Sequence, residues 1–158
     1  MSTAPERLAE IDSCEYLFLR ELSEPRENSL RLLVEEGKPS VLAVPVNVGE
    51  VKLGEGHPVR STEGCRLFEI YWDSYVAYSV RNESYAKNTE SEIASWGRRL
   101  RLYSKSLFLE YLSGATFASP EYPGLTEHSA LACENHIIDV VSTGPLTIRR
   151  LRPLETVH

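Results

Sequence analysis

The sequence lacks most of the short motifs that identify enzymes and nucleotide-binding proteins. Its 158 residues contain no GxGxxG, GxxxxGK[ST], GxSxG, HExxH or paired CxxC pattern. These patterns mark phosphate-binding loops, hydrolase nucleophiles and common zinc or redox sites. Their absence argues against those classes, so we lean against an enzyme. An enzyme built on this chain would need a set of residues with no recognised spacing.

Cysteine and long apolar runs are also scarce. The three cysteines, Cys14, Cys65 and Cys133, are odd in number and far apart, which favours free thiols in a reducing compartment over disulfides. Glu6 and Arg7 are charged where a signal peptide would need apolar residues. Since no apolar run approaches the ~18 residues of a membrane span, we expect a cytoplasmic protein with no membrane partner.

An excess of positive charge is missing as well. The net charge is −6, whereas a nucleic-acid partner requires a basic surface that displaces counterions. We therefore expect no nucleic-acid partner. Residues 97–105 form a local exception, because they include no acid and carry the basic patch Arg98, Arg99, Arg101 and Lys105. This basic patch is either a contact for an anion or acidic partner, or a solvated strand edge that discourages strand pairing.

The overall composition is that of a globular domain. Hydrophobic residues make up 42% of the chain and charged residues 25%, which is ordinary for a folded protein and unlike a disordered one. A chain of this length can bury a complete core. We expect a single domain over residues 1–158, with loose ends at 1–12 and 153–158.

Residues 67–83 alternate between two chemically different faces. One face carries Phe68, Ile70, Trp72, Val76, Tyr78 and Val80, and the other carries Glu69, Tyr71, Asp73, Tyr75, Ser79, Arg81 and Glu83. A period of two predicts a β-strand with a core face and an exposed face. Because a strand this long exceeds the width of a small domain, we expect it to bend near Asp73-Ser74 without breaking its register.

The remaining patterns predict further strands and one helix. Residues 16–22 and 30–36 favour a hairpin, with a helix over 16–22 as the alternative. Pro45 makes 41–48 an edge or bulged strand, and 51–53 a short strand. Residues 84–97 read as a loop and 98–103 as an edge strand. Ser104 is expected to cap a helix over 105–113 that ends at Gly114. Residues 127–133 and 137–142 form a final hairpin, followed by a strand at 146–151.

Together these elements predict an α+β fold. It consists mostly of antiparallel strands, arranged as a strongly bent sheet or a partly open barrel, with one short helix near 105–113. Two segments, residues 103–109 (YSKSLFL) and 132–142 (ACENHIIDVVS), resemble a family of uncharacterised bacterial proteins. The resemblance covers roughly the C-terminal half and implies a bacterial cytoplasmic origin, with no function to carry over.

One group of residues has the chemistry of a metal or catalytic site: His128, Cys133, His136 and Asp139. Imidazole, thiolate and carboxylate bind transition metals, and the same groups form thiol nucleophiles with a base. Their spacing fits no standard metal site, so we expect no metal and no cofactor. The competing interpretation is that Cys133 is a small core residue and His136 lies in a turn.

A second group lies on the polar face of residues 67–83: Tyr71, Asp73, Tyr75 and Arg81. Tyrosine and arginine are frequent interface anchors, so this face predicts a protein or small-ligand contact; the alternative is an ordinary sheet face. The leading hypothesis is a non-catalytic protein-interaction module with a protein partner or self-association. The alternative is a small hydrolase or a metal-binding protein that uses His128, Cys133, His136 and Asp139.

Overall fold

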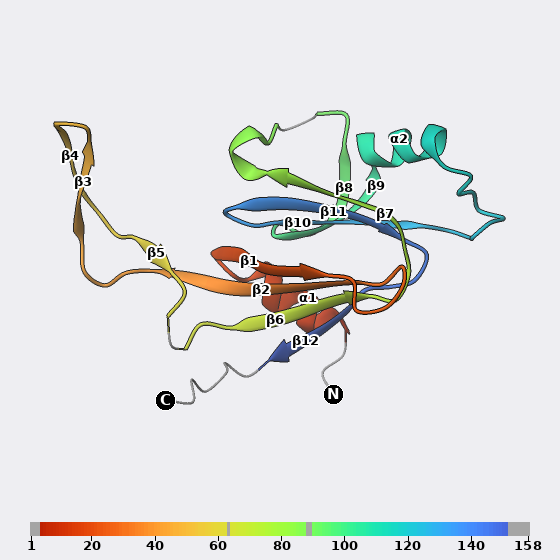
Figure 1. Ribbon diagram of the computed structural model, residues 1–158, viewed down its shortest axis with the longest axis horizontal. Helices are drawn as coiled ribbons and strands as arrows, with labels where there is room; N and C mark the ends of the chain where they lie inside the picture. Colours follow the sequence, from red (N-terminus) through yellow and green to blue (C-terminus); the bar gives the residue numbers. More distant parts are fainter. Residues whose placement is uncertain (1–3, 63, 88–89, 152–158) are drawn as a thin grey trace.

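Two antiparallel β-sheets lie one above the other in the computed structural model, which describes residues 4–62, 64–87 and 90–151 (Figure 1). The first sheet has the order β1-β2-β6-β12, with β5 paired to β2. Its strands are β1 (Tyr16–Ser23), β2 (Leu30–Pro39), β5 (Val59–Arg60), β6 (Leu67–Trp72) and β12 (Thr147–Leu151). The second sheet runs β7 (Tyr75–Asn82), β11 (His136–Ser142), β10 (Glu127–Ala132), β9 (Leu100–Lys105) and β8 (Ile93–Trp96).

The other elements lie around these sheets. Strands β3 (Val44–Val48) and β4 (Val51–Gly56) form a separate two-stranded ribbon, which we call the arm. The described residues also form helices α1 (Ala4–Asp12) and α2 (Leu107–Ala115), and the 3-10 turn η1 (Glu83–Tyr85). The α+β class with mostly antiparallel strands is confirmed. The two sheets are separate and neither closes, so the barrel is not supported.

The hydrophobic core lies between the two sheets. Alternation along each strand sends every second side chain inward, where apolar groups from both sheets and from α1 meet. The core includes Ile11, Leu32, Phe68, Ile70 and Trp72 from α1 and the first sheet, and Leu100, Leu131, Ile138 and Val140 from the second. Burial of these side chains is the main force that holds the sheets together.

The predicted unbroken strand over 67–83 is wrong. The chain does turn at Asp73-Ser74, but there it leaves the first sheet and enters the second, so β6 and β7 never share a sheet. The pairing of β7 with β11 also shifts register between Val141 and Ser142. Tyr75 is therefore partly buried and packs against the core beside Tyr78, with ring centroids 4.8 Å apart. An alternation with a period of two describes only which side chains share a face, so it could not reveal that the chain changes sheet.

The predicted exposure of Glu69 is also wrong. Ile70 and Trp72 are buried and Asp73 is exposed, as expected, but Glu69 is buried too. It lies between arginines on the two neighbouring strands, at 2.7 Å from Arg31 Nε and 2.8 Å from Arg149 Nη2. These ion pairs allow a carboxylate to lie on the outer surface of the sheet with little exposure.

The N-terminal segment is a helix, although a loose end was expected over 1–12. Ile11 of α1 enters the core, and Asp12 Oδ1 accepts the backbone N–H groups of Arg98 and Arg99, each at 2.6 Å. These contacts attach α1 to the turn before β9. The predicted loose end at 153–158 lies outside the described residues, and the single-domain assignment stays a prediction.

The two hairpins are confirmed as β1-β2 and β10-β11, and the last strand as β12. Strand β9 is not an edge, because β8 pairs with it from within the predicted loop at 84–97. The N-cap of the predicted helix is shifted by two residues: Ser106, not Ser104, accepts the Leu109 N–H at 3.1 Å. Gly114 was expected to end this helix but lies inside α2, which ends before Thr116.

None of the helices in the described ranges is long and apolar enough to cross a membrane.

Candidate functional site

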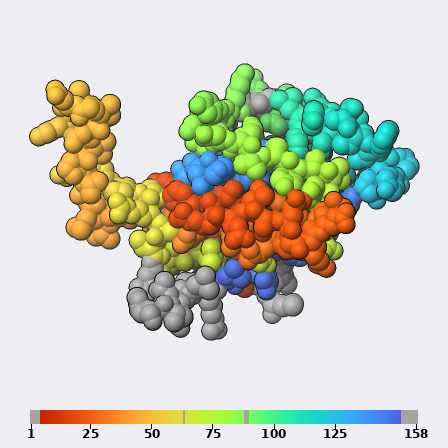
Figure 2. All heavy atoms as spheres, viewed as in Figure 1, coloured from red at the N-terminus to blue at the C-terminus, as the bar shows by residue number. Residues whose placement is uncertain are grey.

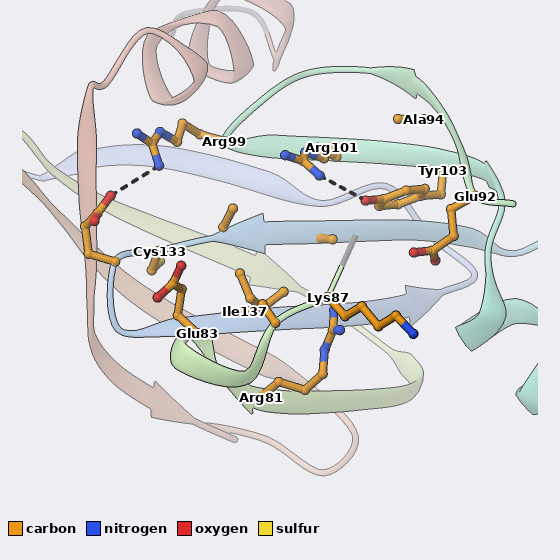
Figure 3. A pocket seen from close by; sticks show the side chains of 14 residues that line it. Arg81, Glu83, Lys87, Glu92, Ala94, Arg99, Arg101, Tyr103, Cys133 and Ile137 are labelled. Carbon is orange, nitrogen blue, oxygen red and sulfur yellow. Dashed lines mark hydrogen bonds and ion pairs between the residues drawn. The ribbon is translucent and has the colours of Figure 1, made fainter. Parts of the chain in front are cut away.

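A pocket of about 480 Å³ lies on the outer face of the second sheet, away from the core (Figure 3). Strand alternation places Arg81, Ile137, Ala130 and Arg101 on this face, one from each of β7, β11, β10 and β9. Residues of η1 and the segment after it line the opposite side. The volume lies in the range of small-ligand sites.

Small side chains form the centre of this pocket. Ala130 and Ala132 of β10 lie between the arginine-bearing strands, with Ile137 and Cys133 beside them. Larger residues at the two alanine positions would fill the space. The pocket therefore depends on two small residues in the middle of a sheet face, a feature that composition alone does not reveal.

Arg81 begins a chain of hydrogen bonds that runs from the pocket into the protein. Its Nη2 donates to Asp139 Oδ2 at 3.1 Å, and Asp139 Oδ1 lies 2.9 Å from His128 Nε2. His128 Nδ1 lies 2.7 Å from Ser106 Oγ, the N-cap of α2. The Ser106 hydroxyl accepts the Leu109 N–H, so its own proton is free to donate to Nδ1. A proton on His128 Nε2, directed at Asp139, completes this series of hydrogen bonds.

Ser106, His128 and Asp139 have the residue types of a hydrolytic triad, but their surroundings do not suit catalysis. All three side chains are buried, and Tyr103 stacks on the His128 ring at a centroid distance of 4.9 Å. A nucleophile must reach a substrate carbonyl. Ser106 instead caps a helix beneath other side chains. The geometry supports a structural role, in which this series of hydrogen bonds holds α2 and the Arg81 side chain in position.

The other cations of the pocket come partly from the predicted basic patch. Arg99 pairs with Glu134 at 3.3 Å and also donates to the Glu15 carbonyl. Arg101 donates to the Arg98 carbonyl at 2.9 Å and to the Tyr103 hydroxyl at 3.4 Å. Arg98 and Lys105 do not line the pocket. Arg98 and Arg99 thus anchor α1, Arg99 and Arg101 line the pocket, and Lys105 does neither.

The predicted metal or thiol site does not come together as one cluster. His128 and Asp139 are paired, whereas Cys133 and His136 lie at the β10-β11 turn, where the Cys133 N–H donates to the His136 carbonyl at 2.8 Å. The described part of the chain contains no group of three or more metal-ligating side chains. Burial raises the pKa of the Cys133 thiol to about 12. A thiol held protonated is a weak nucleophile.

The residues predicted to form one binding face lie in different places. Tyr71 and Asp73 both contact Arg26 Nη2, at 2.9 and 3.3 Å, where the interior strand β6 of the first sheet ends. Tyr75 turns to the core, and its hydrogen bond with Glu24 raises the pKa of its phenol to about 12. Arg81 lines the pocket of the second sheet. A binding role for each residue stays a prediction, but a shared face is ruled out.

Sequence reasoning missed several residues of the site. Lys87 and Glu92 line the pocket from a segment expected to be a polar loop, and Glu83 lines it from the end of the predicted strand over 67–83. Ser106 was overlooked because Ser104, two residues earlier, offered the same capping chemistry. The alternation of His128, Ala130 and Ala132 was the available signal, since it places an imidazole and two small residues on one face.

Comparison with known proteins gives no match for this chain among protein-family models, curated proteins or solved structures. The resemblance over residues 103–109 and 132–142 to an uncharacterised bacterial family stays a prediction. Both segments contribute to the pocket, through Tyr103 and through Cys133 and Ile137.

Proposed function

We propose that this protein is a non-catalytic interaction module that self-associates through its arm. The observation that supports this proposal is an exposed apolar surface on a ribbon that projects from the body of the protein (Figures 1 and 2). Burying apolar surface is the usual driving force of protein association. The occupant that we assign to this surface is a second copy of the chain.

The arm has one apolar and one polar face. Val46 pairs with Gly54 and Asn47 with Lys52, so Leu53 is an extra, unpaired residue that forms a bulge in β4. On both sides of this bulge, apolar residues of β3 pair with apolar residues or glycines of β4. The apolar face carries Val44, Val46, Val48 and Val51, together with Gly54 and Gly56. The polar face carries Pro45, Asn47, Lys52 and Glu55. Within each strand pair, both residues belong to the same face.

Such a ribbon gains little stability by itself. A single two-stranded hairpin is marginally stable in water unless its apolar face packs against another element. Here Val48 is 64% exposed and its partner Val51 60% exposed. Packing of this face against a second molecule would remove these side chains from water and hold the arm in place.

An apolar groove adjoins helix α2. This helix lies at the opposite end of the molecule from the arm (Figure 1). The groove has a volume of about 210 Å³, and it lies between α2 and residues 118–126, with Leu109, Leu112, Leu125 and Val141 among its lining residues. None of the lining side chains is charged. Leu125 is 78% exposed and the nearby Phe117 98% exposed. The arm's apolar face is likewise uncharged, so contact between the two surfaces would bury apolar groups without burying a charge.

Because the arm and the groove are different surfaces at opposite ends, the contact between copies is heterologous. Such contacts close into a ring or continue as an open chain, according to the rotation between neighbours. A symmetric dimer through two arms would leave the groove uncovered. We therefore expect assemblies larger than a dimer at high protein concentration.

The experiment compares the wild type with Val48→Glu in the arm and Leu125→Glu in the groove, by light scattering over a concentration series. Asn47→Glu is the matched control, since it adds the same charge to the polar face of the same strand. We expect wild type and Asn47→Glu to associate, and each of the other two variants alone to be monomeric. A mixture of Val48→Glu and Leu125→Glu retains one intact arm and one intact groove, and is expected to give a dimer of fixed mass.

Two results would overturn the proposal. One is a wild-type protein that remains monomeric at all concentrations. The other is an equal effect of Asn47→Glu and Val48→Glu, which would show that charge in the arm, not its apolar face, controls association. Circular dichroism of each variant establishes that the fold is intact.

A further inference from the structure

We infer that the pocket on the outer face of the second sheet binds a small di-anion, with one anionic group at Arg81 and the other at Arg101. The pocket is separate from the arm and the apolar groove, so this inference does not depend on self-association. Carboxylate and phosphate groups share the chemistry that a guanidinium recognises.

The two arginines lie on opposite sides of the pocket. Arg81 belongs to β7 and Arg101 to β9, and strands β11 and β10 lie between them. Three inter-strand steps of about 4.8 Å separate their backbones by roughly 14 Å. In Figure 3, Arg81 lies at one side beside Lys87, and Arg101 lies across the pocket beside Tyr103. A ligand with two separated anionic groups fits this spacing better than a single small ion.

Both guanidinium groups are held in position before a ligand arrives. Arg101 is fixed by the Arg98 carbonyl and the Tyr103 hydroxyl, and Arg81 by Asp139. Asp139 is itself fixed by buried His128. A guanidinium has five N–H donors, so each arginine retains free donors for a ligand. Such preorganisation reduces the entropy lost on binding.

The charge on Arg101 is not neutralised within the protein. In the part of the chain that the structure describes, no carboxylate forms an ion pair with Arg101 or with Lys87. Arg81 and Arg99, in contrast, pair with Asp139 and Glu134. The unpaired charges of Arg101 and Lys87 attract an anion, and the small alanine side chains leave space for it.

Acidic residues of the pocket limit the size of the ligand. Glu83, Glu92 and Glu134 are among its lining residues. Their carboxylates repel an extended polyanion such as a nucleic-acid backbone, which also agrees with the net charge of −6. We therefore expect a compact di-anion and not a polymer.

Calorimetric titration of the full chain tests the inference with three probes: glutarate, inorganic pyrophosphate and acetate. We expect glutarate or pyrophosphate to bind at least ten-fold more tightly than acetate, because only a di-anion contacts both arginines. Stronger binding of glutarate indicates a dicarboxylate ligand, and stronger binding of pyrophosphate indicates a phosphorylated one. Absence of binding by both glutarate and pyrophosphate, or equally tight binding of acetate, would overturn the inference.

Arg101→Gln is the main variant, since Arg101 has no ion pair to lose and its replacement leaves no carboxylate unpaired. We expect it to weaken binding of the preferred di-anion at least ten-fold. Lys105→Gln is the matched control, because it removes one positive charge from the same strand outside the pocket, and its effect should be less than two-fold. Equal losses for the two variants would show that general surface charge, not the pocket, attracts the anion.

Discussion

Asp139 Oδ1 lies 2.9 Å from His128 Nε2, and both side chains are buried on neighbouring strands of the second sheet. The two residues occupy adjacent strands, β11 and β10, and their pairing links the cap of α2 to the arginine of the pocket. This contact connects the stability of the fold with the geometry of the candidate site.

We expect Asp139→Ala to lower the free energy of unfolding by about 3 kcal/mol, because it leaves a buried imidazole N–H and Arg81 without their acceptor. Urea denaturation measures the change. Asp73→Ala is the control: its side chain is 82% exposed and pairs with Arg26, so the loss should stay below about 1 kcal/mol. Equal losses would mean that the Asp139 pairing adds no stability.

Trp72→Ala is expected to destabilise the protein by roughly 3–5 kcal/mol, since it removes the largest side chain of the core. Trp96→Ala is the matched control, because Trp96 lies on edge strand β8 and is 38% exposed. Denaturation followed by circular dichroism avoids the loss of tryptophan fluorescence. Near-wild-type stability of Trp72→Ala would contradict the packing of β6 against the second sheet.

We expect stability to fall as the solution becomes acidic below about pH 4.5. Hydrogen bonds from Arg66 lower the pKa of Glu36. Burial alone would raise the pKa of Glu69, but hydrogen bonds from Arg31 and Arg149 outweigh it and lower the value. The unfolded chain therefore binds these protons first as the pH falls, so protonation favours unfolding.

Melting temperatures between pH 7 and pH 3 test this dependence. In Glu36→Gln the decrease toward pH 3 should be shallower than in the wild type, although the variant is less stable at pH 7. Glu121→Gln, at an exposed residue, should follow the wild-type profile. A Glu36→Gln profile parallel to that of the wild type would exclude this ion pair as a source of acid sensitivity.

The thiols are expected to be unreactive in the folded protein. All three cysteines are buried, and burial raises the pKa of Cys14 to about 11 and that of Cys133 to about 12. Ellman's reagent at pH 8 should label none of them within minutes, and all three after addition of urea. Rapid labelling of Cys133 in the native protein would revive the hypothesis of a catalytic thiol.

Local patterns predicted the elements whose partners are close in sequence. The β1-β2 and β10-β11 hairpins follow from apolar runs on either side of a polar turn, and both pair as expected. The cap of α2 was misplaced by two residues because Ser104 and Ser106 offer the same hydroxyl. Helix α1 was missed, since its stability depends on Ile11 packing into a core assembled from distant strands.

The sequence by itself determined the alternation of β6, the burial of Trp72 and the antiparallel class, because these depend on side-chain periodicity within a few residues. Only the tertiary structure decided the change of sheet at Asp73-Ser74 and the meeting of Arg81, Asp139 and His128. Those outcomes depend on how strands pair across long stretches of chain. Cross-strand neighbours are set by sheet order and register, which no local pattern contains.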